Sequence, residues 1–168
     1  MPDTPPLPPT FLLGVDPGTT TGLAVACAET GTLALVTSGG PLRAARQIEA
    51  WAASGGLIGA YVEDARALPI YARHGGANRG ERDRIARGVG GVDLLTGLYL
   101  DLLASLGVPA VAVEPVRAAK WDADALRRAT GYARPTNEHG RDAARHVYGR
   151  TCLPATQRGG GAPSSEPS

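Results

Sequence analysis

The sequence predicts an α/β fold in which helices flank a mixed five-stranded sheet. Three short apolar segments come first, separated only by turn-forming residues, and such short connections make neighbouring strands antiparallel. Two further apolar segments follow, each after a segment with helical periodicity, and that order is typical of crossover connections. The first three strands are therefore expected to be antiparallel neighbours, and the fourth strand to run parallel to the first.

The first three strands are expected at residues 11–16, 22–28 and 32–38. Pro17-Gly18 separates the first pair and Glu29-Thr30-Gly31 separates the second, and these residue types favour tight turns. Connections of this length leave no room for a crossover, so each strand is expected to pair with the one before it.

The remaining elements alternate between helices and strands. Apolar residues at helical spacing predict four helices, near residues 42–54, 81–106, 122–130 and 137–149. Apolar runs predict two more strands, at residues 58–63 and 109–113. Residues 64–80 lack periodicity and are expected to form a long loop, a kind of segment that is usually functional or mobile.

Composition predicts one folded domain between two tails. The chain has 168 residues, which is enough to bury a sizeable core in a single domain at residues 11–150. Residues 1–10 are rich in proline, and residues 151–168 contain much glycine, proline and serine. Both tails are therefore expected to be disordered.

The bulk composition excludes several classes of protein. Hydrophobic residues make up 43% of the chain and charged residues 20%, as in soluble globular proteins. No apolar run approaches the roughly 18 residues that a membrane span needs, and the N-terminus lacks the features of a secretory signal. Cys27 and Cys152 are the only cysteines and lie far apart, so a reducing cytoplasm is the expected location.

Arginine is unevenly distributed although the formal net charge is only +1. Six arginines and only two acidic residues occur between positions 66 and 87, and this excess predicts contact with phosphate groups. A solvated surface charge is the better interpretation of any single arginine, whereas the segment as a whole favours phosphate binding. The candidates in this segment are Arg66, Arg73, Arg79, Arg82 and Arg84.

Candidate site residues lie at the ends of two predicted strands and on the last helix. Asp16 ends the first strand and Glu63 ends the fourth, which is expected to be its neighbour in the sheet. His139 and Asp142 are three residues apart and so share one side of a helix. Each of these four residues, taken alone, has a simpler interpretation as a turn cap or a surface charge. Because successive side chains of a strand face opposite ways, Asp64 is an alternative to Glu63 as the inward-facing residue.

If these residues meet, oxygen-rich ligation selects Mg²⁺ or Mn²⁺. Two such ions about 4 Å apart can bracket a phosphodiester, one activating water and the other stabilising the leaving oxygen. Asp16 is the best candidate to bridge both ions, with Glu63 and Asp142 each holding one and His139 completing a shell or assisting proton transfer. Lys120 is either a surface lysine or a cation that neutralises charge on the phosphate.

Three motifs carry a resemblance to a known family. They are D-P-G-T-T-T-G at residues 16–22, V-E-D at residues 62–64 and H-G-R-D-A at residues 139–143. Together, in this order and spacing, they resemble the motifs of the RuvC-like Holliday junction resolvases, which are metal-dependent endonucleases of the ribonuclease H fold. The resemblance covers about residues 11–150 and is closest to divergent, phage-type members.

The resemblance implies a homodimer that binds four-way DNA junctions and nicks two strands symmetrically during DNA recombination and repair. It implies catalytic roles for Asp16, Glu63, His139 and Asp142, assisted by Lys120, with two metal ions per subunit. It places the dimer interface on the helix at residues 81–106, directs the 64–80 loop toward the junction centre, and suggests branch-migration machinery as a further partner.

The sequence also departs from the family pattern. A second family lysine is not found, and Arg134 is the candidate to replace it in DNA binding, beside Lys120. Only Tyr71 and His74 offer π faces in the 64–80 segment, where the family stacks an aromatic residue on a junction base.

Three other functions remain open at this point. A nuclease of the same fold that acts on structured RNA, such as pre-ribosomal RNA, would need nearly the same residues. A non-catalytic DNA-binding protein would tolerate neutral residues at the four ligand positions, and all four are present. An actin-like kinase, suggested by Asp16-Pro17-Gly18-Thr19-Thr20, ranks last because that class needs two such domains.

Overall fold

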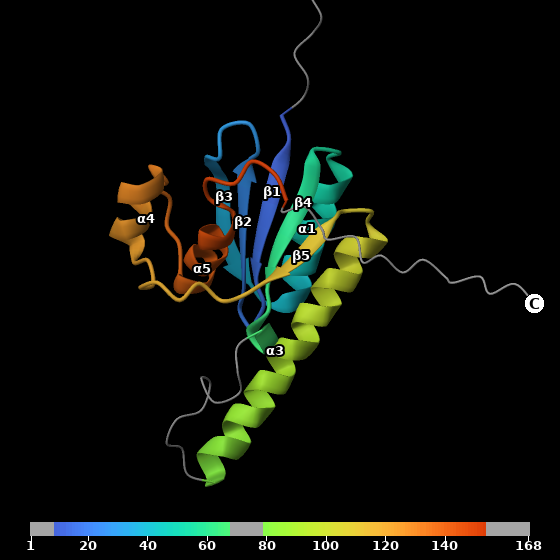
Figure 1. Cartoon of the computed structure of the whole chain (residues 1–168), viewed down its shortest axis with the longest axis vertical. Coiled ribbons are helices and arrows are strands. Elements are labelled where there is room, and N and C mark those ends of the chain that lie inside the picture. The colour runs from blue at the N-terminus through green and yellow to red at the C-terminus, as the bar shows by residue number, and fades with distance from the viewer. Residues whose placement is uncertain (1–8, 68–78, 154–168) are drawn as a thin grey trace, which may run out of the picture.

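The computed structural model describes residues 9–67 and 79–153, which contain one five-stranded sheet of order β3-β2-β1-β4-β5 (Figure 1). The strands are β1 (Phe11–Asp16), β2 (Thr21–Cys27), β3 (Leu33–Gly39), β4 (Leu57–Glu63) and β5 (Ala110–Val113). Antiparallel pairing joins β1 to β2 and β2 to β3, whereas β4 pairs parallel with both β1 and β5. The predicted mixed sheet with three antiparallel strands is confirmed.

Helices cover both faces of the sheet (Figure 1). They are α1 (Pro41–Ala53), α3 (Arg79–Ser105), α4 (Ala123–Thr130) and α5 (Glu138–Val147), with a short 3-10 helix η1 (Ala65–Ala67) after β4. Helices α1 and α3 pack on one face, and α4 and α5 lie on the other. Among the described residues, no helix combines the length and apolar character that crossing a membrane would require.

Alternation along β1 divides the core into two layers, because successive side chains of a strand point to opposite faces. Leu13 and Val15 pack with Ile48 of α1 and Tyr99 of α3. Leu12 points the other way, into the cluster that contains the apolar side of α5. Both faces of β1 are therefore buried, and the end of this strand is held between helices on either side.

The expected loop at residues 64–80 is only partly correct. Residues 65–67 form the turn of η1, and α3 begins at Arg79 rather than at 81. Residues 68–78 lie outside the described part of the chain. The backbone of α3 runs from below the sheet up along its face (Figure 1), so its N-terminal half extends beyond the strands. The other predicted elements agree with the observed ones to within two residues.

Two glycines bring α5 unusually close to the sheet. A Cβ on Gly22 would overlap the backbone carbonyl of His139, and a Cβ on Gly14 would overlap that of Ala143. The helix backbone therefore rests directly on β1 and β2, where no side chain separates the two. This close approach positions the first turns of α5, and with them His139 and Asp142, beside the end of β1.

Candidate active site

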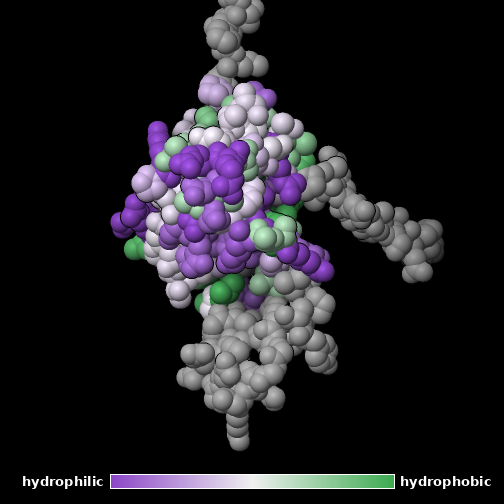
Figure 2. Space-filling view, turned by 90° about the vertical axis from the view of Figure 1, so that its left-hand side faces the viewer, coloured by the Kyte–Doolittle hydropathy of each residue, from purple (hydrophilic) through white to green (hydrophobic). Residues whose placement is uncertain are grey.

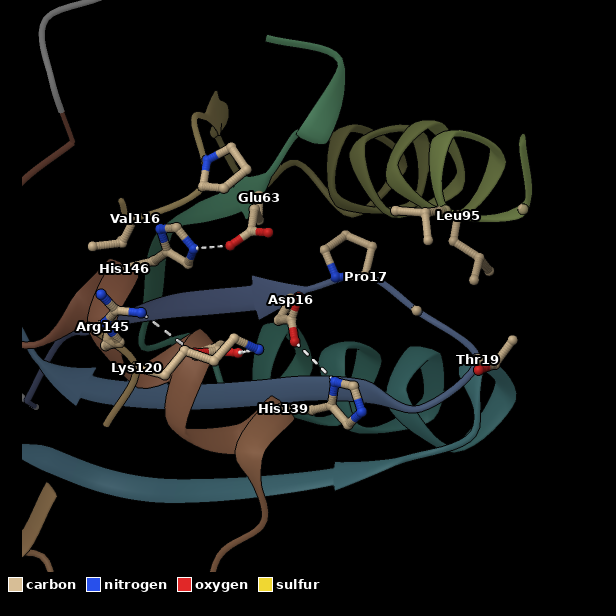
Figure 3. Close-up of a pocket in the computed structure, with 15 residues that line it drawn as sticks. Asp16, Pro17, Thr19, Glu63, Leu95, Val116, Lys120, His139, Arg145 and His146 are labelled. Carbon is tan, nitrogen blue, oxygen red and sulfur yellow. Dashed lines mark hydrogen bonds and ion pairs between the residues drawn. The ribbon is translucent and has the colours of Figure 1, made fainter. Parts of the chain in front are cut away.

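Three carboxylates from distant parts of the chain line one pocket of about 510 Å³ (Figure 3). Asp16 and Glu63 end β1 and β4, and because these strands are parallel neighbours their carboxyl ends lie at the same edge of the sheet. Asp142 reaches the pocket from α5. Four basic side chains line the same pocket: Lys120, His139, Arg145 and His146.

Glu63, not Asp64, faces this pocket. Sequence alternation left the choice open, and the structure places Asp64 outside the pocket lining, where its carboxylate accepts hydrogen bonds from the backbone and guanidinium of Arg66. The arginine Nε lies 2.8 Å from Asp64 Oδ1. The predicted phosphate-binding residue Arg66 is therefore engaged in a local ion pair next to the site.

Each pocket carboxylate has at least one basic partner, and Asp142 has Arg145 as a second one at 3.5 Å (Figure 3). His139 Nδ1 lies 3.2 Å from Asp16 Oδ2, and Lys120 Nζ lies 2.8 Å from Asp142 Oδ2. His146 Nε2 lies 2.6 Å from Glu63 Oε2. The structure thus brings together all five residues that the sequence singled out for catalysis, and adds two basic ones.

The charge balance of the pocket is unfavourable at Asp16. The pKa of this carboxyl is raised from 3.8 to about 6, chiefly by burial, and Glu63 and Asp142 act in the same direction while His139 opposes them. The hydrogen bond to Asp142 raises the pKa of Lys120, which therefore stays charged. Glu63 and Asp142 thus oppose the ionisation of Asp16, and a cation bound near Asp16 would relieve this repulsion.

The donor set fits a hard divalent cation, because it offers three carboxylates with imidazoles beside two of them. Within residues 9–67 and 79–153, no group of three or more acidic, histidine or cysteine side chains is arranged to hold a metal ion as it stands. Each carboxylate instead lies against one or two basic side chains. Ligation at one centre would therefore require some of the pocket side chains to move.

The loop that carries Lys120 is held by two arginines of α5. Arg145 donates to the backbone carbonyl of Ala118 at 2.7 Å, and Arg141 donates to that of Trp121 at the same distance. The two bonds lie on either side of Lys120 in the sequence, so the helix that carries Asp142 also fixes the segment that brings the lysine to it.

The helix α3 supports the two strand ends from the opposite side. The hydroxyl of Thr96 donates to the backbone carbonyl of Glu63 at 3.4 Å. Tyr99 and Thr21 share a buried hydrogen bond of 2.8 Å, and the Thr21 hydroxyl also donates to the carbonyl of Gly18. The turn after Asp16 and the end of β4 are thus both tied to α3. The pocket is also lined by apolar residues: Pro17, Val92, Leu95, Pro115 and Val116.

His146 and Arg145 are not among the residues predicted from the sequence. Both follow from the same helical spacing that selected the predicted pair, since Arg145 lies three residues and His146 four residues after Asp142. The signal was therefore present, and extending the His139 face by one more turn would have found His146. Arg145 also lies 3.5 Å from Asp142 Oδ1, as that spacing allows. The contacts of Arg141 and Arg145 with the backbone carbonyls of the Lys120 loop, by contrast, leave no pattern in the sequence.

Of the remaining predicted nucleic-acid contacts, only Arg134 has a described side chain, and it does not line the pocket. Arg134 is exposed and lines a separate depression with Thr130 and Tyr132, so the structure does not bring it to the carboxylates as a second lysine would be. The helix α3 carries Arg79, Arg82 and Arg84, whose side chains lie outside the described residues. The same holds for the whole of Arg73, Tyr71 and His74.

The sheet order, the helices on both faces and the carboxylates at one sheet edge are those of a ribonuclease H-like fold. The sequence matches no protein-family model and no curated protein. Among solved structures, the fold is similar to T. thermophilus RuvC, whose structure is in complex with a Holliday junction substrate. The TM-score is 0.55 at 20% identity, and the match covers 83% of this chain and 91% of that chain.

Proposed function

We propose that this protein is a metal-dependent endonuclease that resolves four-way DNA junctions by paired, symmetric nicks. The observation that carries the proposal is the convergence of Asp16, Glu63 and Asp142 on one pocket at the edge of the sheet. The similar RuvC structure contains a Holliday junction, and this agrees with the choice of substrate.

Mg²⁺ or Mn²⁺, with two ions per subunit, is the proposed cofactor, and bound ions would activate water and stabilise the leaving 3′ oxygen. Asp16 is the proposed shared ligand, because Glu63 and Asp142 both raise the pKa of its carboxyl. Glu63 and Asp142 would each hold one of the two ions. His139, whose side chain is 37% exposed, is free to join a ligand shell or to move a proton.

Lys120 has a second task in this proposal. Its side chain is 67% exposed and its ammonium neutralises Asp142 in the absence of substrate. If the carboxylates held cations, the ammonium of Lys120 would be free to contact the negatively charged phosphate and to stabilise the charge that grows during cleavage. Its anchored loop keeps it within reach of the pocket.

The proposed assembly is a homodimer formed through α3. The leucines Leu94 and Leu98 are one helical turn apart and are 73% and 50% exposed. The face that carries α4 is by contrast largely hydrophilic (Figure 2). The proposed contacts to the junction arms are Arg73, Arg79, Arg82, Arg84 and Arg134. Branch-migration machinery is a proposed partner, and the cytoplasm is the proposed location.

The decisive experiment offers the full-length protein a labelled four-way DNA junction, a matched duplex and a structured RNA, each with Mg²⁺, Mn²⁺ or EDTA. We expect metal-dependent, paired nicks confined to the junction. Binding of the junction without cleavage under every metal condition would overturn the proposed nuclease activity. Cleavage of the RNA alone would show that the substrate is a structured RNA and not a DNA junction.

Two neighbouring carboxylates provide a matched pair of variants for the same assay. Glu63→Gln removes a pocket carboxylate and should reduce cleavage to background, whereas Asp64→Asn removes one that does not line the pocket and should leave most of it. Equal activity of the two variants would contradict the site assignment, because the side chain of Glu63 faces the pocket and that of Asp64 does not.

A further inference from the structure

Two histidines on α5 contact carboxylates of the site but differ sharply in exposure. His139 and His146 lie two helical turns apart, and each has one ring nitrogen within hydrogen-bond distance of a carboxylate. The side chain of His139 is 37% exposed, whereas that of His146 is only 2% exposed. The first can move out of the way of a ligand, and the second is fixed by what surrounds it.

The packing around His146 leaves little freedom for its ring. The neighbouring residues Ala143 and Val147 are fully buried against the sheet, on a helix that rests directly on β1 and β2. The backbone carbonyl of His146 also accepts a 2.6 Å hydrogen bond from Arg150 Nε. A buried ring in such a setting is a rigid donor or acceptor.

The direction of the hydrogen bond follows from the partner. An ionised carboxylate can only accept, so Nε2 of His146 carries the proton that is shared with Glu63 Oε2. The 2.6 Å between Nε2 and Oε2 is a close contact, just under the range of about 2.7–2.9 Å that is typical of charge-assisted N–H···O bonds. It engages one carboxylate oxygen and leaves Oε1 for another partner.

Glu63 is held at its other end as well. Its backbone pairs with Val113 of β5, and its carbonyl accepts the Thr96 hydroxyl. The carboxylate is therefore anchored through the strand, the α3 contact and the imidazole together. A glutamate side chain otherwise has several rotamers, and fixing it before a cation arrives removes an entropic cost of ligation.

We propose that His146 is a positioning residue for Glu63, which holds Oε2 and presents Oε1 as a ready cation ligand. This inference rests on the proposed function, because it takes Glu63 to be a ligand. His146 itself is not a ligand in this arrangement, since its Nε2 is occupied by Glu63 and its ring is buried. Hydrogen-bond partners of metal ligands typically contribute 10- to 100-fold to metal affinity or activity.

The test uses three substitutions in the full-length protein. His146→Gln retains an amide N–H at about the distance of Nε2, whereas His146→Leu fills similar space without a donor. His146→Asn retains polarity but is too short to reach Glu63, and it replaces the leucine variant if that variant does not fold. Mn²⁺ affinity is measured by titration calorimetry without DNA, alongside thermal unfolding in EDTA and cleavage as a function of Mn²⁺ concentration.

We expect Mn²⁺ affinity to fall roughly 10- to 100-fold in the leucine and asparagine variants and only a few-fold in the glutamine variant. The Mn²⁺ concentration for half-maximal cleavage should rise by the same factor, while the rate at saturating Mn²⁺ changes much less. A merely structural role would instead change thermal unfolding without this dependence on the donor.

Wild-type affinity in the leucine variant would overturn the proposal, and so would equal losses in the glutamine and leucine variants. Absence of Mn²⁺ binding by the wild-type protein would overturn it too. If the wild-type protein binds Mn²⁺ with the expected pattern among variants but cuts no junction, the proposed function fails and the positioning role of His146 stands.

Discussion

Lys120 Nζ lies 2.8 Å from Asp142 Oδ2. The ammonium group therefore neutralises a carboxylate that a bound metal ion would otherwise neutralise. The two residues come from separate segments, yet Arg141 and Arg145 of the Asp142 helix hold the backbone on both sides of Lys120. The contact is therefore built into the fold and does not depend on the flexible lysine side chain alone.

Lys120→Ala should lower the cleavage rate at saturating metal by about 10²- to 10³-fold, the usual loss when one group that stabilises transition-state charge is removed. Affinity for the junction should fall only slightly. The slope of its logarithm against the logarithm of salt concentration should become less steep by about one, the amount expected for one lost phosphate contact. Arg117→Ala is the control, because Arg117 is an exposed cation three residues away that pairs with Glu114. Equal cleavage by wild-type protein and Lys120→Ala would remove the lysine from the mechanism.

Asp16 should make the stability of the metal-free protein depend on pH. Its pKa is raised from 3.8 to about 6 in the folded state, so between these values the folded protein binds more protons than the unfolded chain. Stability should therefore fall as pH rises from about 4 to about 6, by roughly 3 kcal/mol for a shift of this size, and change little above pH 7.

Urea unfolding of wild-type protein and Asp16→Asn in EDTA, at several pH values, measures this effect. The asparagine variant lacks the titrating group, so its advantage in stability over the wild-type protein should grow through this window. Mg²⁺ should reduce that advantage, because a bound cation offsets the buried charge. A difference between the two proteins that is constant from pH 4 to pH 7 would contradict the assignment of the shift to Asp16.

Much of the fold could be predicted because short connections and apolar periodicity determine strand pairing locally. The choice between Glu63 and Asp64 could not, since β4 is buried on both faces and its sequence lacks the alternation that marks an inward side. His146 was overlooked because helical spacing alone does not say how far along α5 the pocket extends. The close contact at Gly22 involves two backbones, and no side-chain pattern announces it.

Gly22→Ala should destabilise the protein by at least about 1–3 kcal/mol, the usual cost of overpacking, because the new methyl group overlaps the His139 carbonyl. The substitution should also move the start of α5 away from β1 and so weaken cleavage beyond what the lost stability explains. Gly40→Ala is the control, since a Cβ there meets no atom within 4 Å and its φ of −62° suits any residue. It should change the free energy of unfolding by less than about 1 kcal/mol. Chemical unfolding measures both variants, and equal stabilities would refute the close packing of α5.

The helix α3 connects the proposed dimer interface to the active site. Its exposed leucines form the proposed interface, while Thr96 contacts Glu63 and Tyr99 contacts Thr21, at the end of the turn after Asp16. Replacing Leu94 and Leu98 together by aspartate should shift the protein from dimer to monomer in light scattering or sedimentation, since like charges would face each other across the interface. Leu42→Asp is the control, with 67% exposure on α1. The monomeric variant should lose paired nicking of the junction and leave at most single nicks. A dimer that persists in the double variant would show that α3 is not the interface, and paired nicks made by a monomer would show that the two cuts do not require two subunits.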